Sequence, residues 1–381
     1  MVHCLSTNIR LDARRPIDVL HAVSEASGKN SRRFARVRCC AAPWTFIQTP
    51  QNSFDDLPFS NARSRRARFR MMNDDPLSLA QTAFAALADL AFACVLGALL
   101  LNVWLSREQA FATVSPARRG WLRAARGGPI AAIALVLCNF ASLWLQAAAM
   151  SGAPIVQAGG ALWLVATGTH AGIGWSVALA GSVLLLLASA GGGALSGTRI
   201  GMALVAALIV AAGKSAIGHA ADAGAFSLAE AVQTLHLLAT AAWGGIVIAG
   251  AFVLPALDTS LARAYLIRTV ARMSRAASVA VAFVVLTGVF NAWRGIGGSA
   301  AVLTASAWGH ALIVKMLLVA AALAFGALNR WSALPRLSRS ASTMDAHTVI
   351  NVMRVEALMM AGVFVAAAVL SHSVPGSSLA G

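Results

Sequence analysis

The chain has 381 residues, of which 58% are hydrophobic and only 12% are charged, and its mean hydropathy is +0.72. Together with repeated apolar runs of about 20 residues, this composition excludes a soluble globular protein and indicates an all-α, polytopic helical bundle in a lipid bilayer. The net charge of +16 does not indicate a nucleic-acid partner, because the basic residues are divided between an N-terminal segment and the loops between apolar runs. The five cysteines have no regular spacing, so neither a disulfide scaffold nor a zinc site is indicated.

Residues 1–70 differ in composition from the rest of the chain. They are rich in arginine, contain no apolar run of signal-peptide length and show no sustained periodicity. Met71 and Met72 follow, and then a short acidic lead at residues 73–76. We expect residues 1–70 to be either a disordered basic tail or an extension that is not part of the natural product, so that translation begins at Met71 or Met72 or residues 1–70 are dispensable. Residues 71–381 are then the membrane domain.

Eight apolar runs in this domain are long enough to cross a membrane. They cover residues 77–101, 130–150, 170–190, 200–218, 228–254, 276–293, 308–328 and 355–372. A further apolar segment, 154–169, is interrupted by Gly159, Gly160 and Gly168 and is too short to cross twice, so we expect an interfacial or re-entrant loop there. The sequence therefore predicts about eight transmembrane helices.

Basic residues alternate between the loops that connect these runs. The loops after the first, third, fifth and seventh runs hold Arg107, Arg118, Arg119, Arg123 and Arg126, then Arg199, then Arg263, Arg268, Arg272 and Arg275, then Arg330, Arg336, Arg339 and Arg354. The loops after the second, fourth and sixth runs hold only Lys214 and Arg294. By the positive-inside rule, the arginine-rich loops face the cytoplasm. Both ends of the membrane domain then face outward, which in a bacterial inner membrane is the periplasm.

Five histidines are predicted on the outward side of this arrangement. His170 opens the third helix, His219 closes the fourth, His236 lies about two turns inside the fifth, His310 opens the seventh and His372 closes the eighth. The short linker 220–227 would bring His219 and His236 into the same leaflet, and Gln233, His236, Thr240 and Trp243 share one helix face. Imidazole is costly in lipid and faces a cavity or a metal about as often as it bonds to a neighbouring helix.

Three other polar or soft residues lie inside the runs. Met150, at the outer end of the second helix, offers a thioether suited to Cu(I), although filling an apolar gap is the commoner role of methionine. Asp89, within the first helix, has two interpretations of about equal weight. It is either a group that binds a proton or a metal, or the partner of a polar group on a neighbouring helix. Glu356, near the inner end of the eighth helix, is expected to pair with Arg330, Arg272 or Arg354.

Several short sequence motifs occur together in the C-terminal half of the chain. They lie in residues 272–293, 308–331 and 354–358 and include Leu286-Thr287-Gly288, Asn291-Ala292, Asn329-Arg330-Trp331 and Glu356, with His219-Ala220-Ala221 and Leu235-His236-Leu237-Leu238 before them. In combination they resemble the CopD family of copper resistance proteins, best over about residues 215–372, more weakly over 77–214 and not over 1–70. The sequence departs from that pattern at Trp308-Gly309-His310, where the family usually has Tyr-Gly-Arg.

The resemblance implies an eight-helix inner-membrane protein that moves copper inward, often beside a periplasmic CopC-like copper-binding partner. We therefore expect a copper transport or resistance protein. Its outward metal site is predicted to draw on His219, His236, His372, His170, His310, Met150 and Asp89. The alternative is a b-type cytochrome, in which two histidines from different helices hold haem b. No nucleophile, base and orienting group form a recognisable set and there is no phosphate loop, so we expect no enzymatic activity.

Overall fold

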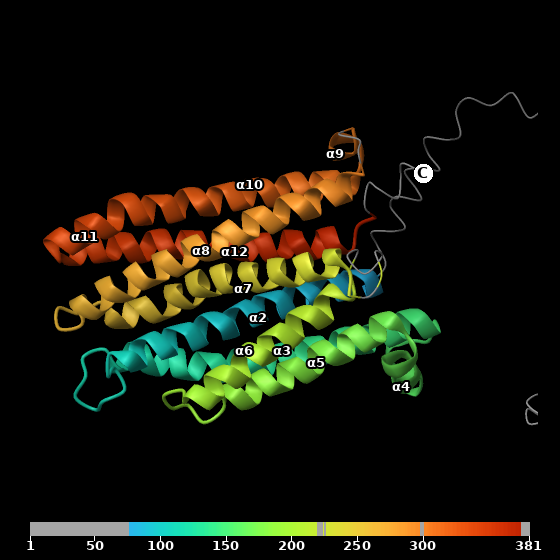
Figure 1. Ribbon diagram of the computed structural model, residues 1–381, viewed down its shortest axis with the longest axis horizontal. Coiled ribbons are helices and arrows are strands. Elements are labelled where there is room, and N and C mark those ends of the chain that lie inside the picture. Colours follow the sequence, from blue (N-terminus) through green and yellow to red (C-terminus); the bar gives the residue numbers. More distant parts are fainter. Residues whose placement is uncertain (1–75, 219–223, 225, 298–300, 375–381) are drawn as a thin grey trace, which may run out of the picture. The chain divides into compact units, whose positions relative to one another are not determined.

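The computed structural model of the protein describes residues 76–218, 224, 226–297 and 301–374. Within these ranges the chain is helical and has no strand, and eight helices are long and apolar enough to cross a membrane. They are α2 (Pro76–Arg107), α3 (Arg118–Ser151), α5 (His170–Ser189), α6 (Gly197–Ser215), α7 (Leu228–Val253), α8 (Arg263–Ile296), α10 (Ala307–Leu328) and α12 (Thr343–Ser371). The predicted all-α polytopic bundle is confirmed, and the helices run side by side along one direction (Figure 1).

In the part of the chain that the structure describes, six shorter elements connect or extend these helices. They are η1 (Ile155–Gln157), α4 (Gly159–Gly168), η3 (Leu254–Leu257), α9 (Val302–Ala305), the π-helical turn η4 (Asn329–Ala333) and α11 (Leu334–Ser340). The segment expected to be an interfacial or re-entrant loop forms η1 and α4, and α4 lies at one end of the bundle (Figure 1). Trp163 and Leu164 of α4 are exposed, as suits a short apolar helix in a membrane interface.

Most of the spanning helices are longer than the apolar runs that predicted them. The helix expected from residue 130 begins at Arg118, the one expected from 276 begins at Arg263, and the one expected from 355 begins at Thr343. Hydropathy marks only the part of a helix that lies in lipid, whereas arginine is a good helix former and continues the helix into the interface. The arginine-rich loops are therefore largely helical turns.

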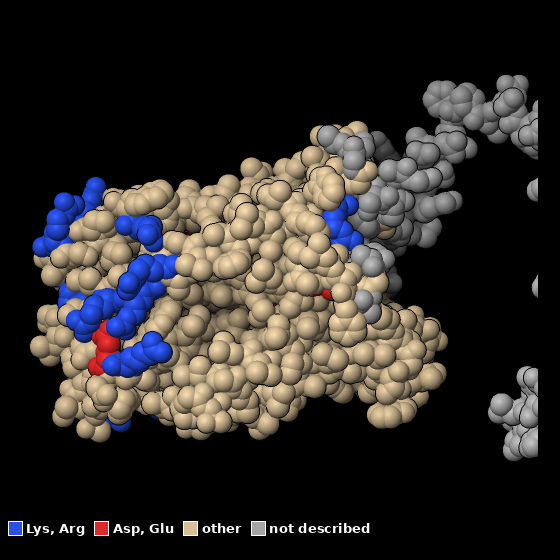
Figure 2. Space-filling model, in the orientation of Figure 1, with Lys and Arg blue, Asp and Glu red and all other residues tan. Residues whose placement is uncertain are grey.

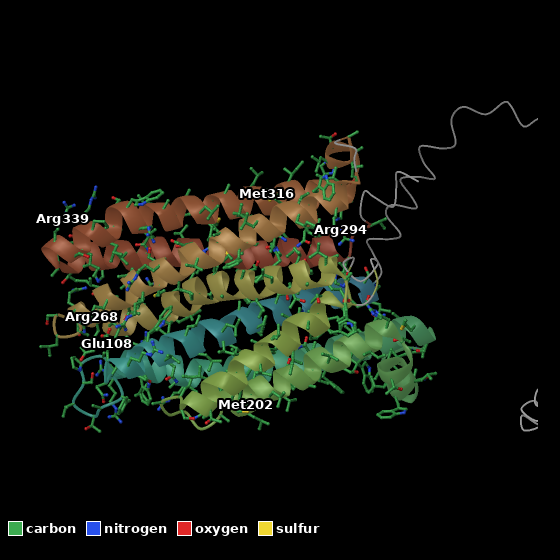
Figure 3. All side chains as sticks on the ribbon, in the orientation of Figure 1. Glu108, Met202, Arg268, Arg294, Met316 and Arg339 are labelled. Atoms are coloured by element: carbon green, nitrogen blue, oxygen red, sulfur yellow. The ribbon has the colours of Figure 1, made fainter. Side chains whose placement is uncertain are left out.

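Lysine and arginine gather at one end of the bundle, with Arg294 as an exception that lies toward the opposite end (Figures 2 and 3). We call the first end the arginine end. There Glu108 accepts hydrogen bonds from Arg268, and both residues are labelled side by side in Figure 3. The opposite end, where α5, α7 and α10 begin and α12 ends, we call the histidine end.

Helix α7 lies in the middle of the bundle, where it contacts α2, α6, α8 and α12. Its contact with α2 is unusually close, because a Cβ at Gly97 would lie 1.9 Å from the Gly245 carbonyl oxygen. Small residues permit such backbone contact between helices in lipid, where no hydrophobic force drives their association. On its other side, α10 packs mainly on α12, and few of its described residues are buried.

Candidate functional site

Among the described histidines, His236 is the one that the bundle buries, with 9% of its surface exposed. Its depth follows from where α7 begins. The Ser227 side chain caps the helix by accepting from the Glu230 N–H, and the Glu230 carboxylate accepts from the Phe226 N–H. With the helix start fixed in this way, His236 lies about two turns inside it and faces α8.

The His236 ring is oriented by a hydrogen bond to α8. Its Nδ1 lies 2.9 Å from Thr287 Oγ1, and the Thr287 hydroxyl donates its own proton to the Phe283 carbonyl at 2.5 Å. When the one proton of the Thr287 hydroxyl goes to the Phe283 carbonyl, Nδ1–H is the donor to Thr287 and Nε2 carries the lone pair of the ring. Gly288 allows this approach, because a Cβ there would lie 3.3 Å from His236 Cε1.

The polar face predicted on α7 continues on both sides of His236. One turn toward the histidine end, Gln233 Oε1 accepts from Asn291 Nδ2 of α8 at 2.8 Å. One turn toward the arginine end, Thr240 Oγ1 is buried with no hydrogen-bond partner among the described residues. Trp243 follows and donates to the Glu356 carboxylate of α12. These residues form a polar strip through a largely apolar bundle.

The other predicted ligands lie apart from His236. His170 and His310 are exposed at the starts of α5 and α10, and Met150 is 50% exposed at the end of α3. His372 is exposed after α12, where its Nδ1 contacts the Ala368 carbonyl at 2.9 Å. His219 falls outside the described residues. Within the described ranges, no three His, Cys, Asp or Glu side chains are grouped closely enough to hold a metal ion.

Asp89 is engaged by a lysine. Its carboxylate lies 3.0 Å from Lys214 Nζ of α6, and that ammonium also lies 5.6 Å from the centre of the Trp175 ring. Lys315 of α10 is within electrostatic range of Asp89 and of His236. This ion pair is one of the two interactions that the sequence allowed for Asp89, and its role toward a proton or a metal stays a prediction.

The pairing expected for Glu356 is wrong. Each of the three arginines is engaged elsewhere: Arg272 with Glu108 at 2.7 Å, Arg330 with Ser274 and Ser278, and Arg354 with Asn351. Glu356 is instead buried and accepts from Trp243, because its position on α12 turns it toward α7 rather than toward the arginine end. Gly326 of α10 also approaches it, since a Cβ there would lie 3.0 Å from Glu356 Oε1.

Glu356 lines a cavity of about 440 Å³ between α7, α8, α10 and α12. Met273, Met353 and Asn329 line the same cavity, and no pattern in the sequence singled out the two methionines. Asn329 belongs to one of the motifs that carry the family resemblance. Its burial accompanies the π-helical turn η4, which hydrophobic periodicity does not reveal. The cavity lies in the half of the bundle nearer the arginine end.

A haem held by His236 would need a second histidine as its other axial ligand, and the other described histidines do not lie near His236. His170, His310 and His372 are exposed at helix ends, and His347 pairs with Asp258 at the arginine end, 2.8 Å apart. A haem held by two histidines would need one of them opposite His236 on another helix. The haem alternative therefore finds no support among these residues.

Two family models match the chain. Copper resistance protein D-like, N-terminal domain, matches residues 72–229, and Copper resistance protein D matches residues 267–370. Most of α7, including His236, lies between the two matched ranges. No curated protein and no solved structure matches the chain. The two matches together cover more than half of the chain and correspond to the resemblance found in the sequence, so this multi-pass membrane protein belongs to the copper resistance protein D (CopD) family.

Proposed function

We propose that the protein moves copper inward across a bacterial inner membrane and that His236 first holds the ion within the bundle. The observation that carries this proposal is the buried imidazole of His236, whose Nδ1 is hydrogen-bonded to Thr287. Copper ligands must be deprotonated, and imidazole suits copper in either common oxidation state. The copper resistance family supplies the identity of the ion.

The Thr287 hydroxyl acts on the metal through the imidazole. A metal-binding histidine usually donates its other N–H to an oxygen, which fixes the tautomer and the orientation of the ring. Here that oxygen is Thr287 Oγ1, and the bond leaves Nε2 as the atom that can bind copper. His219, which precedes the linker to α7, is the second ligand we propose. A periplasmic CopC-like protein is the donor that the family resemblance implies.

The direction of copper transport depends on how the bundle is oriented in the membrane. The distribution of charged residues supports the orientation that we propose. Arginine-rich ends of helices remain on the cytoplasmic side, so the histidine end would face the periplasm. A reporter active only in the periplasm should be active when fused after His372 and silent when fused within residues 330–339. The reverse pattern would overturn the orientation and, with it, the inward direction.

The site is tested by copper accumulation in cells that express single variants. His236→Ala should abolish copper accumulation, because it removes the proposed ligand from a helix face. Thr287→Val should reduce it, since the imidazole stays but its tautomer is no longer fixed. Membrane levels of each variant are measured in parallel. Full accumulation and full copper binding in both His236→Ala and His219→Ala would rule out the histidine site.

A further inference from the structure

Two methionine sulfurs lie near Gly250 of α7. A Cβ at Gly250 would lie 2.8 Å from Met353 Sδ and 3.6 Å from Met273 Sδ, so both sulfurs adjoin the same point. Met273 comes from α8 and Met353 from α12, and both side chains are buried. The missing side chain at Gly250 gives the two thioethers the space they occupy. Glycine weakens a helix interior, so a packing role of this kind accounts for its presence in α7.

Oxygen donors lie in the cavity that these methionines line. Glu356 follows Met353 by about one helical turn on α12, so the two side chains share a face. Glu356 forms no ion pair with a described residue, although it is buried. Asn329 is 5% exposed, and its Oδ1 has no hydrogen-bond partner in the part of the chain that the structure describes. Buried polar atoms without a partner are rare and point to a missing ligand, water or ion.

The backbone at this cavity is also unusual. Asn329 is the first residue of η4, a π-helical turn between α10 and α11. Such turns are rare and occur frequently at functional sites. In this case the turn accompanies the burial of Asn329 and the exposure of Arg330 next to it. The Arg330 guanidinium bonds to the Ser274 and Ser278 hydroxyls, so its hydrogen bonds are made to α8 and not to Glu356.

The geometry points to a Cu(I) site formed by Met273, Met353 and Glu356, with Asn329 Oδ1 as an additional donor. The site rests on the proposed copper function, and the ion remains Cu(I) throughout, so no electron transfer is involved. Thioethers are soft ligands that select Cu(I), whereas Mg²⁺ and Ca²⁺ take oxygen ligands. The buried carboxylate supplies the negative charge that a monovalent cation needs in a medium of low dielectric constant.

This site extends a line of donors that begins at His236. Gly250 lies about 21 Å from His236 along α7, at 1.5 Å per residue. Met360 of α12 lies between them, because its Cε would be 2.9 Å from a Cβ at Gly244. Met353, Glu356 and Met360 recur on one face of α12 at helical spacing, and all three are buried. The proposed Cu(I) site therefore lies on the arginine side of the same route.

Extended X-ray absorption at the copper edge tests the site directly. The full chain, labelled with selenomethionine and purified in lipid nanodiscs, is loaded with one equivalent of Cu(I) under a competing chelator. The unsubstituted protein should show a copper–selenium shell. Met273→Leu with Met353→Leu should lose it, because leucine conserves volume but has no donor atom. The same two methionine substitutions should also remove the copper–selenium shell when they are made in a His236→Ala variant. That variant lacks only the proposed ligand at the histidine end.

Met316→Leu is the matched control, because Met316 is 55% exposed on the outer surface of α10 (Figure 3). It should keep the copper–selenium shell. The site is overturned if the unsubstituted protein has no such shell, or if the double variant keeps it. The first of these readings does not require any variant to fold. If the shell behaves as expected but cells show no copper uptake, the proposed direction fails and the site stands.

Discussion

Two carboxylates that lie largely inside the bundle, one in each half, have different surroundings. Asp89 of α2 lies 3.0 Å from Lys214, whose ammonium also adjoins Trp175. Glu356 of α12 has no ion-pair partner among the described residues and borders a cavity of about 440 Å³. A buried charge that is neutralised by a fixed partner is a structural element, whereas one that faces a cavity can serve a cation that passes through.

Other buried polar groups occur in both halves of the bundle. In the N-terminal half, other buried polar groups also bond to one another: Asn139 with Ser182, and Trp121 with Asn102 and Ser106. Both halves also hold buried oxygens without a described partner, such as Ser142 Oγ in the N-terminal half and Thr240 Oγ1 and Asn329 Oδ1 in the C-terminal half. Unsatisfied groups are costly unless they act on a ligand. The comparison therefore rests on the two carboxylates themselves, since Asp89 has a fixed cationic partner and Glu356 faces a cavity.

Breaking the Asp89–Lys214 pair should have the largest effect on stability. Lys214→Met leaves a buried carboxylate without its partner, and Asp89→Asn leaves a buried ammonium, so each should lower the free energy of unfolding by about 3–5 kcal/mol. Thermal unfolding of the purified variants, followed by size-exclusion chromatography, measures this loss. Asp89→Asn combined with Lys214→Met should recover most of the stability. If the single variants are as stable as the unsubstituted protein, the pair is not structural.

Glu356→Gln should separate function from stability. The substitution keeps the shape of the side chain and an acceptor for Trp243, so the free energy of unfolding should change by less than about 1 kcal/mol. Copper accumulation should fall about tenfold, which corresponds to about 1.4 kcal/mol, because the negative charge is lost. Unfolding and uptake are measured on the same preparations. A large loss of stability with normal uptake per folded molecule would make Glu356 structural, like Asp89.

His347→Ala should have the smallest effect. The imidazole lies 2.8 Å from the Asp258 carboxylate at the arginine end, but Arg263 also binds that carboxylate at 2.7 Å. The His347 side chain is 56% exposed, so water replaces it readily and an exposed pair contributes about 0–1 kcal/mol. Copper uptake and thermal unfolding should both be close to those of the unsubstituted protein. A strong loss of uptake would extend the route to this residue.

The sequence was sufficient for the class of fold, because apolar runs of membrane-spanning length have few other interpretations. It also predicted the face of α7 that carries Gln233, His236 and Trp243, since helical spacing alone determines which residues share a face. The ends of helices were harder to predict from the sequence, because charged residues continue a helix after hydropathy has fallen. The start of α3 at Arg118 is an example.

Contacts between helices could not be read from the chain. The sequence suggested an arginine partner for Glu356, yet the rotation of α12 turns it toward Trp243. Met273 and Met353 are far apart in sequence, and only the packing of α8 and α12 around Gly250 brings their sulfurs together. His170, His310 and His372 were expected at one end of the bundle and do lie at helix ends there, but sharing an end does not bring side chains together.

The backbone contact between Gly97 and Gly245 has a mechanical consequence. It holds α7 against α2 so closely that sliding or rotation of either helix would produce a clash, so α7 would be the fixed wall of the proposed copper route. Alternating access then requires the opposite wall to move, and α10, which contacts mainly α12, is the helix with least to restrain it. Spin-label distances between α2 and α7 should stay constant when copper is added, while those between α7 and α10 change.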